Sequence, residues 1–184
     1  APAKDVEPSA AFTQVGKTWP TEGRQIGIVV GQDVDVAALK SLLIAVDEAD
    51  MVPLVIAPTG GEVGGGVVAQ RTYLTARSIE FDAVLVASNA APGDDAHHGL
   101  DAKAAAAGPE GLDPRVALLL QEVWRQAKAL GAWGSGAEVL TTLKLDDSAG
   151  VETGSDPVEV FKTIMALLSQ HRAWDRFPTT GRLA

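Results

Sequence analysis

Residues 25–57 read QIGIVVGQDVDVAALKSLLIAVDEADMVPLVIA, with two short apolar runs on either side of a helical pattern. The runs Ile26–Val30 and Val52–Ala57 are continuous and rich in β-branched residues. Such runs are typical of strands buried on both faces in a parallel sheet. Between them apolar residues recur at helical spacing, and Asp33 or Asp35 suits the N-cap of that helix. The stretch therefore predicts a strand–helix–strand unit.

The same alternation continues along the chain. It predicts a hairpin over 62–73, strands over 82–87, 132–134 and 150–153, and helices over 114–130, over 137–143 and from 157 onward. Asp113-Pro114 and Asp156-Pro157 supply an N-cap and a first-turn proline to two of these helices. Gly131 suits the left-handed position after the 114–130 helix. The pattern predicts an α/β fold, a three-layer flavodoxin-like domain with a mostly parallel sheet and helices on both faces.

The segments outside this pattern are the two ends and one long loop. Residues 1–24 hold three prolines and balanced charges, so we interpret them as an arm or linker from something upstream, packed in places by Phe12, Val15 and Trp19. Because no initiator Met is present, residue 1 is expected to be a cut end. Residues 25–184 are expected to form the domain, with a long acidic, solvated loop over 88–112.

Composition excludes several classes of function. The 184 residues include 46% hydrophobic ones, enough for a core, and the net charge is −9. An acidic surface disfavours nucleic acids and anionic membranes as partners, and no apolar run approaches the roughly 18 residues of a membrane span. The absence of Cys excludes disulfides, thiolate catalysis, iron–sulfur clusters and Cys-type zinc sites.

Ligands on a parallel α/β sheet bind at the carboxyl ends of the strands. After the first strand, Asp33 and Asp35 stand where a dinucleotide site needs G-x-G-x-x-G, so phosphate binding is disfavoured there. Gly60–Gly66 lacks the Lys-Ser/Thr of a P-loop and is better explained as turn glycine. A small neutral ligand near Asn89 and Ser135 stays open as an alternative.

The segment Trp133-Gly134-Ser135-Gly136 has the strand-to-helix turn of a nucleophile elbow, although G-x-S-x-G is absent. Catalysis by Ser135 would need a His, and His97 and His98 are the candidates, in the acidic loop. With neighbouring carboxylates these two His could also chelate a metal adventitiously. A solvated loop is the simpler interpretation, because a built metal site needs rigid support.

The C-terminal segment holds the aromatic and cationic residues His171, Arg172, Trp174, Arg176 and Phe177. One interpretation is structural, since cations favour a helix C-terminus and the aromatic rings pack on the body. The other is a docking tail for another domain or subunit, because Trp and Arg are preferred interface anchors. The two interpretations are compatible.

The order of elements from Ile26 to Leu168 is similar to the glutamine-amidotransferase-like superfamily of PfpI-type proteases, deglycases and chaperones. In that superfamily a Cys occupies the elbow, where this chain has Gly134. The resemblance implies that Asp33 matches the acidic partner, while no His lies between His98 and His171 to complete the set. It therefore implies a vestigial site at Gly134, Ser135 and Asp33.

A closer resemblance is to the C-terminal domain of large-subunit monofunctional haem catalases. Three segments carry it: Gly23–Val30 after the arm residues Ser9–Phe12, then Phe81–Ala87, and most specifically the ending Gln170–Pro178, QHRAWDRFP. The resemblance covers essentially the whole chain. It implies an appendage to a haem-bearing core that decomposes hydrogen peroxide, within a cytoplasmic homotetramer.

What this resemblance implies for the fragment is a non-catalytic accessory domain without haem or metal. Its partners would be the catalase core and the other subunits, and its role would be subunit stability and assembly. Relatives in the superfamily also imply a chaperone-like holdase role toward unfolded clients. The alternatives are a PfpI-type hydrolase or deglycase with a replaced nucleophile, and a small-ligand sensor.

Overall fold

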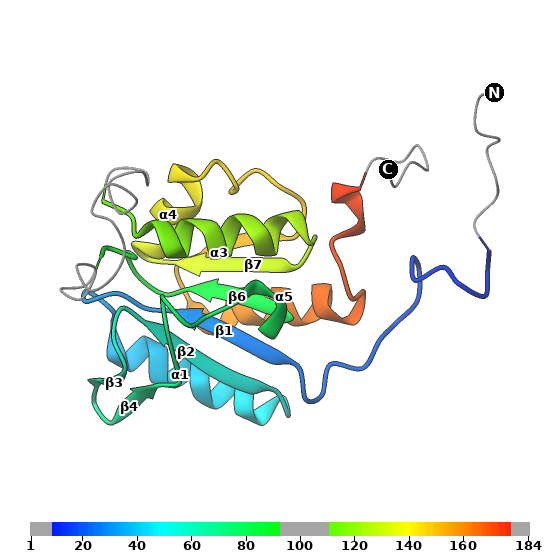
Figure 1. The fold of residues 1–184 in the computed structure, drawn as a ribbon. Helices are drawn as coiled ribbons and strands as arrows, with labels where there is room; N and C mark the ends of the chain where they lie inside the picture. Colours follow the sequence, from blue (N-terminus) through cyan, green and yellow to red (C-terminus); the bar gives the residue numbers. More distant parts are fainter. Residues whose placement is uncertain (1–8, 93–110, 178–184) are drawn as a thin grey trace.

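The computed structural model describes residues 9–92 and 111–177, and it confirms the three-layer α/β fold (Figure 1). Its main sheet has the strand order β5-β2-β1-β6-β7-β8 with every pair parallel. The strands are β1 (Gln25–Val29), β2 (Val52–Ala57), β5 (Arg71–Thr72), β6 (Ala83–Val86), β7 (Ala129–Trp133) and β8 (Val151–Gly154). The helices are α1 (Val36–Glu48), α3 (Pro114–Arg125), α4 (Gly136–Thr142) and α5 (Pro157–Ser169), with 3-10 turns η1 (Ser78–Glu80) and η3 (Trp174–Arg176). An antiparallel hairpin, β3 (Gly61–Gly64) and β4 (Val67–Ala69), confirms the excursion predicted over 62–73, except that Arg71 and Thr72 pair with β2 in the main sheet.

Two hydrophobic clusters hold the layers together, one on each face of the sheet. α3 and α4 pack on the face that contains Val29 and Val86, and α1 and α5 pack on the face that contains Ile28 and Leu85. Successive side chains of a strand point to opposite faces. Central strands buried on both faces therefore need continuous apolar runs, which is the pattern of β1 and β6.

The predicted helix starts are confirmed at three positions. Asp35, rather than Asp33, caps α1 by accepting hydrogen bonds from two backbone N–H groups. Asp113 and Asp156 cap α3 and α5 in the same way, each followed by proline in the first turn. Among the described residues, no helix has the length and apolar character needed to cross a membrane.

The prediction for the end of α3 is wrong. The helix ends at Arg125 rather than near Leu130, and Ala127, with φ 53°, takes the left-handed position expected for Gly131. Gly131 lies instead within β7, which is longer than the predicted 132–134 strand. A Cβ on Gly131 would lie 2.4 Å from Leu85 Cδ2, so its role is close packing rather than chain reversal.

The arm is less packed than predicted. Phe12 and Val15 are 87% and 57% exposed, which corrects two of the three expected contacts. Trp19 does pack. Its backbone N–H donates to the Ser169 carbonyl at 2.7 Å, and the centroid of its ring lies 5.7 Å from that of the His171 ring. Most of the loop predicted over 88–112 lies outside the described residues, as do His97 and His98.

Candidate functional site

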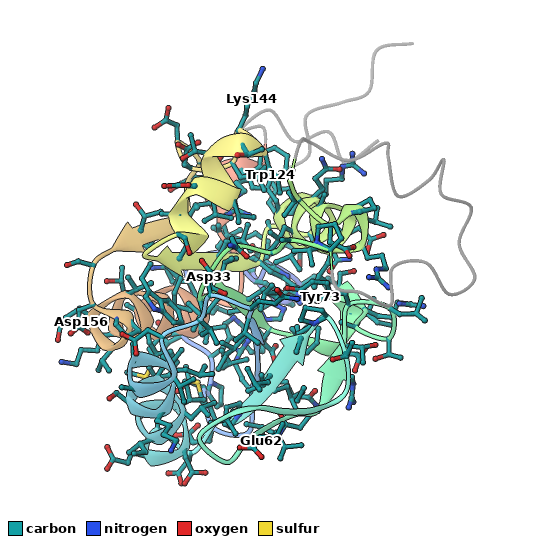
Figure 2. All side chains as sticks on the ribbon, turned by 90° about the vertical axis from the view of Figure 1, so that its left-hand side faces the viewer. Asp33, Glu62, Tyr73, Trp124, Lys144 and Asp156 are labelled. Carbon is teal, nitrogen blue, oxygen red and sulfur yellow. The ribbon has the colours of Figure 1, made fainter. Side chains whose placement is uncertain are left out.

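The carboxyl ends of β1, β6 and β7 bring together three polar groups predicted to lie there. The Ser135 hydroxyl donates to Asp33 Oδ2 at 2.8 Å and accepts from the Asn89 backbone N–H at 3.0 Å. Figure 2 looks onto this edge and shows Asp33 near the centre of the view. Asp33 and Asn89 are exposed, and Ser135 is half-buried.

Close backbone packing fixes these groups in place. The Gly31 N–H donates to the buried Ser88 hydroxyl at 2.6 Å, which joins the end of β1 to the end of β6. A Cβ on Gly31 would lie 1.9 Å from the Asn89 carbonyl oxygen. A Cβ on Gly136, the first residue of α4, would lie 2.2 Å from the Val86 carbonyl oxygen. Only glycine allows these approaches.

Gly134 occupies the turn between β7 and α4 with φ +54°. Its position is exposed, and a Cβ built there would meet no heavy atom of the described residues within 4 Å. A side chain at this position would therefore project into open space, as a nucleophile elbow requires. Glycine places no reactive atom there.

Ser135 is the nearest hydroxyl, and its hydrogen bonds are to a carboxylate and to a backbone N–H. A nucleophilic serine needs a positioned base to take its proton. The single described imidazole, His171, contacts Trp19 and packs beside Arg24, which precede β1, so it lies at the opposite edge of the sheet. Within the described residues, the structure thus supplies Ser135 with no imidazole base.

The small cavity at this edge does not include the predicted ligand residues. Its volume is about 210 Å³, and it opens between the β1–α1 turn and the β3–β4 hairpin. The lining includes Gln32, Thr59 and Glu62, but neither Asn89 nor Ser135. Figure 2 shows Glu62 apart from Asp33. The ligand site predicted at Asn89 and Ser135 is therefore separate from this cavity and stays a prediction.

Tyr73, the one tyrosine of the chain, is not placed to ligate a haem iron. Haem iron takes an axial ligand such as Tyr, His, Cys or Met. The Tyr73 hydroxyl is buried and donates to the Val30 carbonyl at 2.6 Å, and burial, with Asp113 nearby, raises the pKa of this phenol. Tyr73 is therefore held as a neutral structural donor. In the part of the chain that the structure describes, no three metal-binding side chains gather.

The C-terminal segment folds back onto its own domain. Arg176 donates to three carbonyl oxygens: Ala149 at 2.5 Å, Lys128 at 2.9 Å and Trp124 at 3.0 Å. Its guanidinium lies 5.7 Å from the Trp124 ring centroid, and burial lowers its pKa to about 10. Arg176 therefore anchors the tail by contacts within the domain.

The aromatic residues of the tail also make contacts inside this domain. Trp174 Nε1 donates to the Gln170 carbonyl at 2.8 Å, and its ring lies 5.7 Å from that of Phe177. Both residues are half-buried. These contacts agree with the structural interpretation of the tail, in which its residues pack on their own domain. Docking of the tail onto another chain stays a prediction.

The fold and the strand-end geometry define a flavodoxin-like α/β domain with an elbow turn that carries glycine. Residues 22–178 match the family described as the C-terminal domain found in long catalases, and the chain belongs to this family.

Two curated relatives are similar to this chain along nearly its whole length. Catalase HPII of Pseudomonas aeruginosa is 26% identical over 184 residues, which cover 97% of this chain and 24% of the relative. Catalase HPII of Mycobacterium avium is 25% identical over 205 residues, which cover 95% of this chain and 26% of the relative. The chain thus spans about a quarter of the length of the curated relatives it matches.

Proposed function

We propose that this chain is the accessory C-terminal domain of a cytoplasmic haem catalase and supports the stability and assembly of a homotetramer. The observation that carries the proposal is the family match over residues 22–178. The peroxide chemistry belongs to a haem-bearing core elsewhere in the protein. Within the domain, the functional surface is one that contacts this core and other subunits.

The proposal includes that the domain itself is not catalytic. Gly134 leaves the elbow without a nucleophile, and Gly134, Ser135 and Asp33 are the remnant of an ancestral site. The Ser135–Asp33 hydrogen bond now serves to hold the ends of β1 and β7 together.

An apolar face supports the role in assembly. Leu74, Ile79 and Leu118 are 49%, 81% and 54% exposed. They line two neighbouring cavities of about 350 and 400 Å³ that share Arg77 and Glu122. Grouped apolar side chains on a surface mark interaction sites. The same surface is what a holdase activity toward unfolded clients would require.

The proposal is tested by adding haem and hydrogen peroxide to the 184-residue chain. We expect no Soret band beyond that of free haem and no oxygen release above a haem-only control, because Tyr73 is buried and already hydrogen-bonded. An inert acidic protein of equal size controls for non-specific haem adsorption. A saturable Soret shift with peroxide turnover would contradict the proposal.

A further inference from the structure

Charged residues from four segments meet at the amino edge of the sheet, opposite the elbow. Parallel strands begin at the same edge, so the residues preceding β1, β6 and β7 lie near one another. The end of α5 reaches the same place, as the Trp19–Ser169 hydrogen bond shows. We call this group the amino-edge cluster; its members are Arg24, Asp82, Lys128, His171 and Arg172.

Asp82 is the single carboxylate of the amino-edge cluster. It accepts from Arg24 Nη1 at 3.3 Å and from the Gln25 backbone N–H at 3.0 Å. Within the described residues, the charged groups acting on His171 are Arg172, Arg24, Asp82 and Lys128. Two arginines and one lysine thus share one carboxylate, in a chain whose net charge is −9.

The contacts of His171 assign its ring proton to Nε2. Arg24 Nη1 and Arg172 Nη1 lie 3.4 and 3.3 Å from His171 Nδ1. Guanidinium nitrogens only donate, so Nδ1 acts as the acceptor and the ring proton resides on Nε2. Burial, together with the two neighbouring guanidinium groups, lowers the pKa of His171, so the ring is neutral at pH 7.

Two further donors beside this ring lack full partners. Lys128 is 6% exposed, and within residues 9–92 and 111–177 its ammonium group makes one hydrogen bond, to the Ser78 carbonyl at 2.6 Å. In the same residues, the buried Trp19 Nε1 atom has no acceptor. Buried donors and cations that lack partners are costly. The amino-edge cluster therefore presents an excess of N–H groups and positive charge with too few acceptors.

We propose that the amino-edge cluster binds an oxyanion, namely the carboxylate of an acidic side chain on a docking partner. Arg24 and Arg172 supply planar donors that suit a carboxylate, and the half-buried His171 supplies a third. The negative charge of the whole chain weakens the binding of free anions, so a free dicarboxylate is expected to bind less tightly than a carboxylate that a docked surface holds in place. This inference does not depend on the catalase assignment.

Anion binding and protonation of His171 are coupled. An oxyanion beside the ring favours the imidazolium, so binding raises the His171 pKa, which burial and the surrounding cations lower. By reciprocity, protonated His171 strengthens the binding of the anion. Binding is therefore expected to be tighter at pH 6 than at pH 8.

The test follows the His171 ring by NMR in the full 184-residue chain during titration with malonate or inorganic phosphate at constant ionic strength. We expect the Nε2–H tautomer without anion, a saturable shift with malonate, and a raised His171 pKa. Arg172→Gln is expected to weaken malonate binding about tenfold or more. Arg24→Gln provides a second variant, and Lys144→Gln, at an exposed site, removes the same charge as a control.

A shift that rises linearly without saturation would overturn the proposal, as would equal responses in Arg172→Gln and Lys144→Gln. Saturable binding of phosphate but not of malonate would overturn the assignment to a carboxylate. Near-UV circular dichroism, which reports the packing of the four tryptophans, verifies that the variants keep the native packing. If Arg172→Gln disturbs that packing, Arg24→Gln decides the result.

Discussion

Gly136→Ala is expected to lower the free energy of unfolding by at least about 3 kcal/mol, or to prevent folding. The added Cβ would lie 2.2 Å from the Val86 carbonyl oxygen and 2.7 Å from the Val86 carbonyl carbon. Both atoms belong to β6, a central strand paired on both sides. The β6 backbone cannot move away without breaking its hydrogen bonds in the sheet. The clash therefore has to be relieved by a movement of α4. Urea denaturation followed by Trp fluorescence measures the loss.

Gly60→Ala is the matched control for this substitution. A Cβ at Gly60 would meet only Thr72 Cγ2, at 4.0 Å, and Gly60 is not among the glycines with positive φ. We expect a change within about 0.5 kcal/mol. If Gly136→Ala proved as stable as Gly60→Ala, the close contact between the α4 start and β6 would be wrong, and with it the geometry of the elbow.

Arg176→Ala is expected to destabilise the domain by about 2–3 kcal/mol and to release the C-terminal segment. The guanidinium donates to carbonyls of two segments, the α3–β7 turn (Trp124 and Lys128) and the turn before β8 (Ala149), so its removal breaks three hydrogen bonds that tie the tail to the domain. Burial of the cation without a carboxylate has its own cost, as its lowered pKa shows, so the net loss is smaller than the sum of three charged hydrogen bonds. Urea denaturation and limited proteolysis measure the two effects.

Arg125→Ala controls for the loss of one positive charge and one long side chain near the end of α3. Arg125 is exposed, so its removal is expected to change stability by no more than about 0.5 kcal/mol. A loss in Arg176→Ala no larger than in Arg125→Ala would show that the tail is held by contacts other than this anchor.

Local sequence signals were sufficient for much of the fold. The β1 and β6 runs predict buried strands because both faces of a central parallel strand are covered. The Asp-Pro pairs at 113–114 and 156–157 predict helix starts because the capping chemistry is local. The end of α3 was missed for a long-range reason: Leu130 continues the helical spacing, but pairing of β7 with β6 and β8 determines the backbone there.

Some residues of the candidate sites could be predicted from local sequence, and others depend on long-range contacts. Asp33 and Ser135 were predicted at strand ends, and parallel topology brings them within 2.8 Å. The anchoring of Arg176 to its own domain could not be predicted, because its three acceptors are backbone carbonyls without a side-chain signature. The amino-edge cluster was missed although one signal was available: Arg24 and Asp82 both lie just before strands that pair in parallel.

The most direct test of the accessory role compares the proposed long catalase with and without residues 22–178. We expect peroxide turnover per bound haem to stay the same, while the assembly dissociates or unfolds at a lower temperature in calorimetry and light scattering. Loss of turnover per haem in an assembly that remains intact would contradict this role, and so would unchanged thermal stability after the deletion.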